Sequence, residues 1–209
     1  EELARVTAAD ALRHPNWRMG RKITVDCATL VNKGLEVIEA HWLFGVDYEK
    51  INVVIHPQSL VHSLVCFRDG SVKAQLGPAD MRRPIADALL GRERPANPSP
   101  RLDLLQAGRL DFLPPDESRF PGLRAMLRAG QRGGLLPAYL NGANEALVEA
   151  FLRDEIPYLF IGDALCRLLE QAPPELQGGS AAAGLDAVLA ADARGRADAA
   201  GLMENKHAD

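Results

Sequence analysis

Three polar side chains that could act together stand close in the sequence, at Asn32, Lys33 and Glu36. The surrounding residues predict a helix over about 28–44, and residues four apart in a helix are neighbours on one face. A carboxylate oxygen suits Mg²⁺ or Mn²⁺, and a lysine ammonium suits a phosphate group as a point charge. The same pattern describes a solvated helix face with a weak ion pair, and the spacing alone favours that simpler interpretation.

Two loops offer further candidate groups. His14 and Trp17 lie in a loop bounded by proline and glycine, and a tryptophan there could be a mobile lid that excludes water when a ligand binds. An ordinary buried tryptophan that anchors the loop is the alternative, and without further evidence it is preferred. His56 and His62 flank a Pro-Gln-Ser segment, a spacing without metal-ligand regularity, so structural hydrogen bonding is expected for both.

One acidic residue in the second half of the chain is a weaker candidate. Glu145 follows Asn141 and Asn144 closely and could act as an acid, but the sequence supplies no partner for it. An asparagine that caps the following helix is the simpler interpretation.

The elements that must position these groups follow a shift in composition. Aromatic and β-branched residues gather before about residue 90, whereas alanine, leucine and arginine dominate after it, as expected for a mixed α/β unit followed by helices. We predict an α+β fold with a small sheet and a C-terminal helical bundle. The predicted parts are a catalytic α/β domain at 1–92, a proline-rich linker at 93–120 and a C-terminal helical domain at 121–209.

Periodicity and capping signals predict the helices. A capping box from Thr7 to Asp10 opens a short helix that ends near Arg13. In the 28–44 helix, four apolar residues recur at a spacing of three and four and should share one side: Val31, Leu35, Ile38 and Trp42. Further helices are predicted near 82–90, 122–130, 137–153, 160–172, 184–192 and 194–206.

The strand signals lie in the first half of the chain. Residues 23–25 should be a short extended run, and the β-branched run 51–55 should be a strand buried on both faces. Asp69-Gly70 between the runs 60–67 and 71–76 is a strong hairpin signal. The free edge of such a hairpin must be covered or paired with another subunit.

Composition also excludes several classes of protein. A net charge of −4 and a pI near 5.8 give no electrostatic footprint for nucleic acid. No apolar run reaches the roughly 18 residues of a membrane helix, and the first residues lack the order of a signal peptide. Cys27, Cys66 and Cys166 form no CxxC pair, which argues against a zinc site or a disulfide framework. A cytoplasmic protein with reduced thiols is therefore expected.

Taken together, the longer segments resemble one family. His14–Gly20 (HPNWRMG), Val25–Glu36 (VDCATLVNKGLE) and His56–Ser63 (HPQSLVHS) are similar to consecutive segments of the 1-deoxy-D-xylulose 5-phosphate reductoisomerases. Asn141–Glu145 (NGANE) resembles their helical C-terminal domain, and the likeness runs from about residue 7 to about residue 170.

The resemblance implies an NADPH-dependent oxidoreductase and isomerase that uses Mn²⁺ or Mg²⁺ and works as a homodimer. Its phosphorylated substrate would become 2-C-methyl-D-erythritol 4-phosphate, for isoprenoid biosynthesis. In this family the carbon skeleton is rearranged first, and hydride then reduces the aldehyde formed.

The resemblance also implies roles for single residues. Glu36 is expected to be a catalytic residue, a substrate contact and one carboxylate of the divalent-metal site. His14 and Lys33 are expected to be catalytic and to contact the substrate, and Asn32 to contact the substrate. Trp17 and Met19 match the flexible flap over the ligand, and Gly20 matches a position near the nicotinamide cofactor.

Two departures from the family pattern carry expectations of their own. Cys27 occupies a substrate-binding position where the family usually has serine, and because a thiol is a weak donor, affinity for the substrate should suffer. The family's glycine-rich NADPH domain and the strand with the other two metal carboxylates should lie upstream of Glu1. The chain is therefore expected to be an engineered or proteolytic fragment that is inactive in isolation.

Two other hypotheses remain open at this point. The chain could be a non-catalytic dimerisation module that shares the fold and binds nothing. It could also be a separate metal-dependent enzyme acting on phosphate esters. Failure to bind any phosphorylated ligand favours the first, and turnover by the chain alone favours the second.

Overall fold

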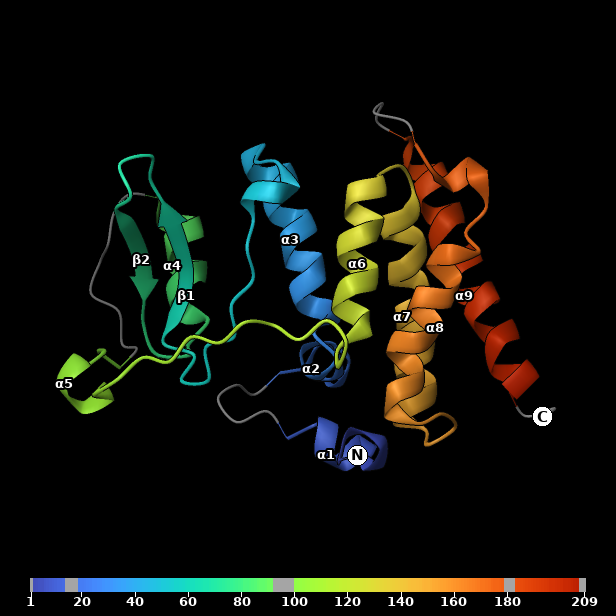
Figure 1. The fold of residues 1–209 in the computed structure, drawn as a ribbon, viewed down its shortest axis with the longest axis horizontal. Coiled ribbons are helices and arrows are strands. Elements are labelled where there is room, and N and C mark those ends of the chain that lie inside the picture. Colours follow the sequence, from blue (N-terminus) through green and yellow to red (C-terminus); the bar gives the residue numbers. More distant parts are fainter. Residues whose placement is uncertain (1, 14–18, 92–99, 179–182, 207–209) are drawn as a thin grey trace. The chain divides into compact units, whose positions relative to one another are not determined.

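The computed structural model describes residues 2–13, 19–91, 100–178 and 183–206 (Figure 1). The chain divides into two compact units. The first joins the N-terminal segment and Met19–Val53 to Asp116–Asp209, and the second is built from Val54–Pro115. In the sequence, the second unit is therefore inserted between Met19–Val53 and Asp116–Asp209 of the first unit.

The first unit is helical. It begins with η1 (Glu2–Arg5) and α1 (Ala8–Ala11), and α1 carries the predicted capping box between Thr7 and Asp10. The remaining elements follow in chain order: α2 (Arg21–Ala28), α3 (Val31–Phe44), η2 (Tyr48–Lys50), α6 (Pro121–Arg132), α7 (Leu136–Leu152), α8 (Tyr158–Glu170), η3 (Pro174–Leu176) and α9 (Leu185–Lys206).

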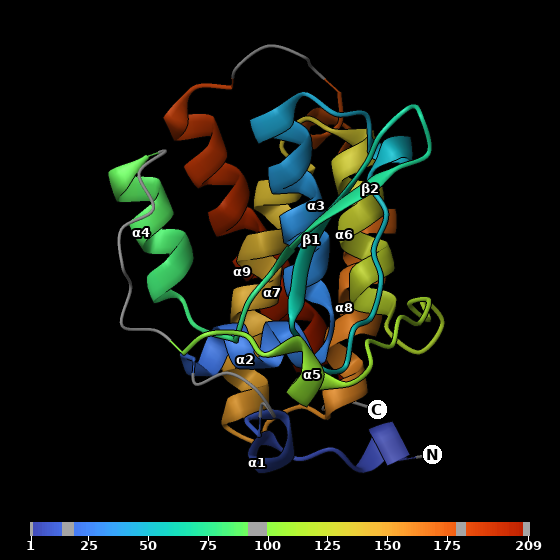
Figure 2. The ribbon, with the colours of Figure 1, turned by 90° about the vertical axis from the view of Figure 1, so that its left-hand side faces the viewer.

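The core of this unit lies where these helices pack side by side, as Figure 2 shows for α6, α7 and α8. α3 packs on α6, α6 on α8, and α7 on both α8 and α9. Large side chains that are fully buried come from α6, α7 and α8: Leu123, Met126, Leu136, Tyr139, Leu140, Leu147, Ile161 and Leu165. Burial of these apolar side chains is the main favourable term in the folding of the bundle.

The crossing of α7 and α9 is unusually close. A Cβ added at Gly142 would overlap the backbone of Asp192, and one added at Gly195 would overlap the carbonyl oxygen of Tyr139. Both positions therefore require a residue without a side chain, because backbone atoms of the opposite helix occupy the space.

The second unit contains a two-stranded antiparallel sheet. β1 (Val61–Cys66) pairs with β2 (Val72–Leu76), with an irregularity between Val61 and Ser63. Gly70 adopts φ +85° in the turn, so the predicted Asp-Gly hairpin is confirmed. α4 (Arg82–Leu90) and the short α5 (Leu104–Ala107) complete the unit. The α+β class predicted from the sequence is confirmed.

Three strand and helix predictions were wrong. Residues 23–25 are part of α2, because Val25 and its neighbours are buried and tertiary packing overrides the local preference of Ile-Thr-Val for extended backbone. Residues 51–55 form no strand in the described structure apart from an isolated bridge between Ile55 and Leu113. The two helices expected at 184–192 and 194–206 are the single helix α9.

The predicted 28–44 helix is interrupted. α2 ends at Ala28 and α3 starts at Val31, because Leu30 adopts the left-handed conformation with φ +59°. Trp42 was expected to share one apolar side with Val31 and Ile38 but is 73% exposed. The buried residues of α3 are Val31 and Ile38, as expected, together with Gly34 and Val37.

The compact units also cut across the domain ranges expected from the sequence. Residues 19–53 pack with the C-terminal helices, while much of the expected linker, from 100 to 115, lies in the second unit and contains α5. The expected ranges 1–92, 93–120 and 121–209 stay a prediction about functional domains.

Candidate functional site

The joint between α2 and α3 positions the candidate residues. α2 begins after Gly20, whose carbonyl accepts a hydrogen bond from the Thr24 hydroxyl at 2.8 Å. At the other end, the buried Thr29 hydroxyl donates to the carbonyl of Val25 at 3.1 Å and that of Asp26 at 3.2 Å. The left-handed turn at Leu30 follows, so the direction of α3 is set within two residues.

The three candidate side chains on α3 do come together. The Asn32 amide donates to Glu36 Oε1 at 2.7 Å, and the Lys33 ammonium donates to Glu36 Oε2. The side chains of Lys33 and Glu36 are 40% and 45% exposed, so the cluster is accessible to a ligand. We call Asn32, Lys33 and Glu36 the α3 cluster.

Cys27 is an electrostatic neighbour of the α3 cluster. Burial raises the pKa of the half-buried Cys27 thiol, the negative charge of Glu36 raises it further, and the Lys33 ammonium opposes the shift. The thiol is therefore neutral at pH 7, and it is a weak hydrogen-bond donor. Cys27, Cys66 and Cys166 are free thiols in the described structure.

The other predicted site residues lie before α2. Met19 is partly buried, and Gly20 is the N-cap residue of α2, with nothing within 4 Å of the place where a Cβ would stand. His14 and Trp17, two of the sequence-predicted site residues, lie outside the described residues. Their proposed roles as substrate contacts stay predictions.

Sequence reasoning missed a buried polar pair beside this site. Asp26 on α2 is 2% exposed and Asn144 on α7 is fully buried, and the Asn144 amide donates to Asp26 Oδ1 at 2.7 Å. The Lys22 ammonium donates to Asp26 Oδ2, also at 2.7 Å. The i,i+4 spacing of Lys22 and Asp26 was a usable signal, but nothing local indicates a partner 118 residues away.

The expected helix cap in the NGANE segment was wrong. Asn141 and Asn144 both lie inside α7, where Asn144 is a buried partner of Asp26 rather than a cap. Glu145 pairs with Arg196 of α9 and accepts a long hydrogen bond from Asn141. The Glu145 carboxylate therefore links α7 to α9.

The two histidines of the second unit make the structural hydrogen bonds predicted for them. His56 Nδ1 lies 2.8 Å from the Asp111 carbonyl oxygen, and the ring stacks on Phe112 with centroids 4.8 Å apart. His62 Nε2 lies 3.0 Å from the Ser59 carbonyl oxygen.

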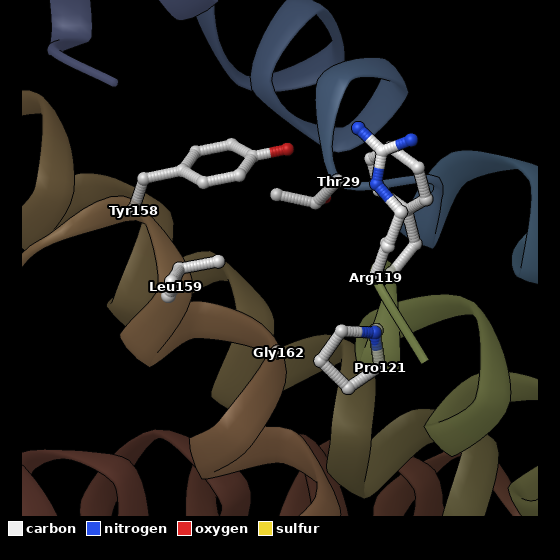
Figure 3. A pocket seen from close by; sticks show the side chains of 8 residues that line it. Thr29, Arg119, Pro121, Tyr158, Leu159 and Gly162 are labelled. Carbon is white, nitrogen blue, oxygen red and sulfur yellow. The ribbon is translucent and has the colours of Figure 1, made fainter. Parts of the chain in front are cut away.

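A small pocket of the first unit lies apart from the α3 cluster. Figure 3 shows Tyr158 and Gly162 of α8 facing Thr29 and Pro121. The Tyr158 hydroxyl donates to the Ala28 carbonyl oxygen at 2.6 Å, and burial raises the pKa of Tyr158 to about 12. The hydroxyls of Tyr158 and Thr29 both donate to backbone carbonyls of α2. These two polar groups of the pocket therefore hold helices in place, and they are not free to bind a ligand.

The side chains of the α3 cluster provide few ligands for a divalent metal ion. Among the described residues, no three His, Cys, Asp or Glu side chains lie close enough to hold a metal ion. Glu36 offers one carboxylate, which the ammonium of Lys33 already pairs. By themselves these residues do not make a complete Mg²⁺ site, which needs several oxygen ligands around a reluctantly dehydrated ion.

In the described part of the chain, no helix has the length and apolarity to cross a membrane.

Fold and site together define a class of protein: an α+β chain with a helical C-terminal part that presents an amide, an ammonium and a carboxylate on one accessible helix face. More particularly, the chain belongs to the 1-deoxy-D-xylulose 5-phosphate reductoisomerase family. A family model for the DXP reductoisomerase C-terminal domain matches residues 76–198, and a model for the 1-deoxy-D-xylulose 5-phosphate reductoisomerase C-terminal domain matches residues 1–44.

Curated relatives carry the same family name. The 1-deoxy-D-xylulose 5-phosphate reductoisomerase of Gloeobacter violaceus is 52% identical over 208 residues, which cover 100% of this chain and 52% of the relative. That of Burkholderia vietnamiensis is 53% identical over 201 residues, covering 96% of this chain and 49% of the relative. The chain spans about half the length of the curated relatives it matches.

Solved structures agree with the assignment. The reductoisomerase from Zymomonas mobilis in complex with NADPH superposes with a TM-score of 0.86 at 41% identity, over 97% of this chain and 51% of that chain. A DOX-P reductoisomerase in complex with NADPH, fosmidomycin and magnesium superposes with a TM-score of 0.90 at 40% identity, with the same coverage.

Proposed function

We propose that this chain supplies the substrate-binding part of a reductoisomerase that converts 1-deoxy-D-xylulose 5-phosphate to 2-C-methyl-D-erythritol 4-phosphate with NADPH, in isoprenoid biosynthesis. The observation that carries the proposal is the α3 cluster, an accessible amide, ammonium and carboxylate held together by hydrogen bonds in a member of this family. Such a set can hold a phosphorylated molecule and a divalent ion side by side.

Within this proposal each residue of the α3 cluster makes a different interaction, which depends on its charge. Lys33 contributes a positive point charge to the phosphorylated substrate, and Asn32 contributes an amide that can donate to an oxygen. Glu36 contributes one carboxylate oxygen toward Mg²⁺ or Mn²⁺, with the other ligands coming from outside the described residues. When bound, such an ion stabilises negative charge on substrate oxygens.

The residues around the cluster complete the proposed site. His14, Trp17 and Met19 cover and contact the substrate, and Gly20 lies near the nicotinamide of NADPH. Cys27 lies beside the substrate as a neutral thiol, in agreement with its raised pKa.

A chimeric enzyme tests the proposal. The segment of the Gloeobacter violaceus reductoisomerase that matches this chain is replaced by the chain itself, and NADPH oxidation is followed with substrate and Mn²⁺. The proposal requires turnover by the chimera. An inactive chimera with a native circular dichroism spectrum and cooperative melting would favour the non-catalytic alternative.

In the chimera, Lys33→Ala should lower kcat/KM by about 10–100-fold, because a hydrogen bond to a charged group is worth about 1.5–3 kcal/mol. Lys50→Ala is the matched control, since Lys50 is also an exposed lysine paired with an acid three residues away, Asp47. Steady-state kinetics should show the control within twofold of the parent (about 0.4 kcal/mol). Equal losses in both variants would remove Lys33 from the site.

We also propose that the chain forms a homodimer through the hairpin of β1 and β2. Several large apolar side chains of this hairpin are about half exposed in the described structure: Leu64, Val65, Phe67 and Val72. An exposed apolar hairpin with unpaired edges is suited to a second copy.

Light scattering at micromolar concentration should therefore give twice the chain mass of 22.7 kDa. Val65→Glu should shift the species toward the monomer, because it places a charge on the apolar surface while Lys73, its cross-strand partner, can pair with it within the hairpin. Val54→Glu, at a residue of similar exposure outside the strands, is the control. A monomeric parent chain contradicts the proposal.

A further inference from the structure

The buried carboxylate of Asp26 joins two distant parts of the first unit. Its Oδ1 accepts from the Asn144 amide of α7, its Oδ2 accepts from the Lys22 ammonium of α2, and both distances are 2.7 Å. Asp26 is 2% exposed and Asn144 is fully buried. Water cannot replace a lost partner in such a place, so the two side chains hold each other strongly.

Asp26 stands directly before the turn that sets the direction of α3. The carbonyl of Asp26 accepts from Thr29, Leu30 is left-handed, and α3 begins at Val31. Asn32 and Lys33 follow in the first turn of α3. Only a few ordered residues separate the end of α2 from Asn32 and Lys33. A shift or tilt of the end of α2 therefore changes the positions of these two side chains.

The choice of residue types supports a role in orientation. An apolar pair of similar volume would hold α2 on α7 about as firmly, because buried ionic groups add little net stability compared with hydrophobic packing. An amide facing a carboxylate differs from an apolar contact in fixing direction as well as proximity, since the hydrogen bond is strong only over a narrow range of angles.

We propose that Asp26 and Asn144 form a positioning pair, which fixes the end of α2 against α7 and so orients Asn32 and Lys33 for the phosphorylated substrate. Neither residue touches the α3 cluster through a hydrogen bond of the described structure. The inference rests on the proposed function, because it gives the pair its role through the cluster.

The kinetic test uses the chimeric enzyme. Asn144→Asp places a second carboxylate against Asp26, and KM for the substrate should rise about tenfold while kcat changes less, since a misplacement far from the chemistry can cost up to about 100-fold. The double variant Asp26→Asn with Asn144→Asp restores an amide–carboxylate bond in the reverse sense and should recover most of the affinity. If Asn144→Asp does not fold, Asn144→Ser, which shortens the side chain without adding charge, should show the same rise in KM.

A matched control separates orientation from stability. Tyr139→Phe removes a hydrogen bond from α7 to Asp198 of α9, at 3.0 Å, and leaves the contact to α2 intact. It should lower the melting temperature without changing KM. An unchanged KM in Asn144→Asp, or a rise in KM of the same size in Tyr139→Phe, would overturn the positioning role.

A second measurement needs no activity. Cys27 follows Asp26 directly and is half-buried, so its alkylation by iodoacetamide at fixed pH in the 209-residue chain, read by mass spectrometry, reports the order of the α2–α3 joint. Alkylation should be faster in Asn144→Asp and near the parent rate in the double variant and in Tyr139→Phe. An inactive chimera combined with this labelling pattern defeats the proposed function but keeps the pairing, whereas unchanged labelling defeats the pairing itself.

Discussion

Purified by itself, the 209-residue chain should oxidise no NADPH above background when 1-deoxy-D-xylulose 5-phosphate and Mn²⁺ are present. Glu36 is the one metal carboxylate that the family resemblance assigns to this sequence, and a single carboxylate leaves Mg²⁺ mostly with its own waters. Hydride transfer also needs the nicotinamide held against the substrate, and the 209 residues contain no GxGxxG-type loop.

The comparison is with the chimeric enzyme, which contains the same residues and should turn over under the same conditions. Calorimetric titration of the isolated chain with Mn²⁺ should show weak binding without a defined stoichiometry. Turnover by the chain alone, or tight stoichiometric binding of the metal, would instead support a separate metal-dependent enzyme with its own complete site.

Gly195→Ala should lower the free energy of unfolding by about 3 kcal/mol, the upper part of the usual range for overpacking. The new methyl group would overlap the carbonyl oxygen of Tyr139, which belongs to the backbone of α7 and cannot rotate away. The two helices must therefore move apart, which loosens the most extensive helix contact of the first unit. For a chain of this size the melting temperature should fall by about 6–12 °C.

Gly201→Ala is the matched control on the same helix. Nothing lies within 4 Å of the place where its Cβ would stand, so alanine should raise stability by about 0.5–1 kcal/mol through its higher helix propensity. Thermal denaturation followed by circular dichroism gives both values. If the two variants melt together, the close approach of α7 and α9 is not present in solution.

The parts of the site that depend on local sequence were predictable. Asn32, Lys33 and Glu36 are brought together by the geometry of one helix, and the hairpin is specified by its Asp-Gly turn. The pairing of Asp26 with Asn144 was not predictable, because a contact between residues 118 apart leaves no trace in local spacing. The accessible side of α3 was likewise predicted only in part: Trp42 is exposed, and whether an apolar residue of a helix is covered depends on neighbours that the sequence does not identify.

The two wrong strand predictions have a common physical cause. Residues 23–25 and 51–55 are both rich in β-branched side chains, which favour extended backbone on a pleated surface. In the first segment, burial against other helices and the Lys22–Asp26 pair favour α2 instead. In the second, a strand needs a partner, and within the described residues only Ile55 finds one, at Leu113.

The order of the two units along the chain has a consequence for synthesis. α2 and α3 are made before α6 and α7, on which they pack, and the whole of Val54–Pro115 is synthesised in between. At about 5–20 residues per second, Asn144 leaves the ribosome roughly 6–24 s after Asp26. During this interval the apolar side of α3 lacks α6, and the Asp26 carboxylate has Lys22 but not yet Asn144 as a partner. The hairpin unit can fold in the meantime. The nascent helices α2 and α3 are thus the segment on which a chaperone that binds exposed apolar surface would act.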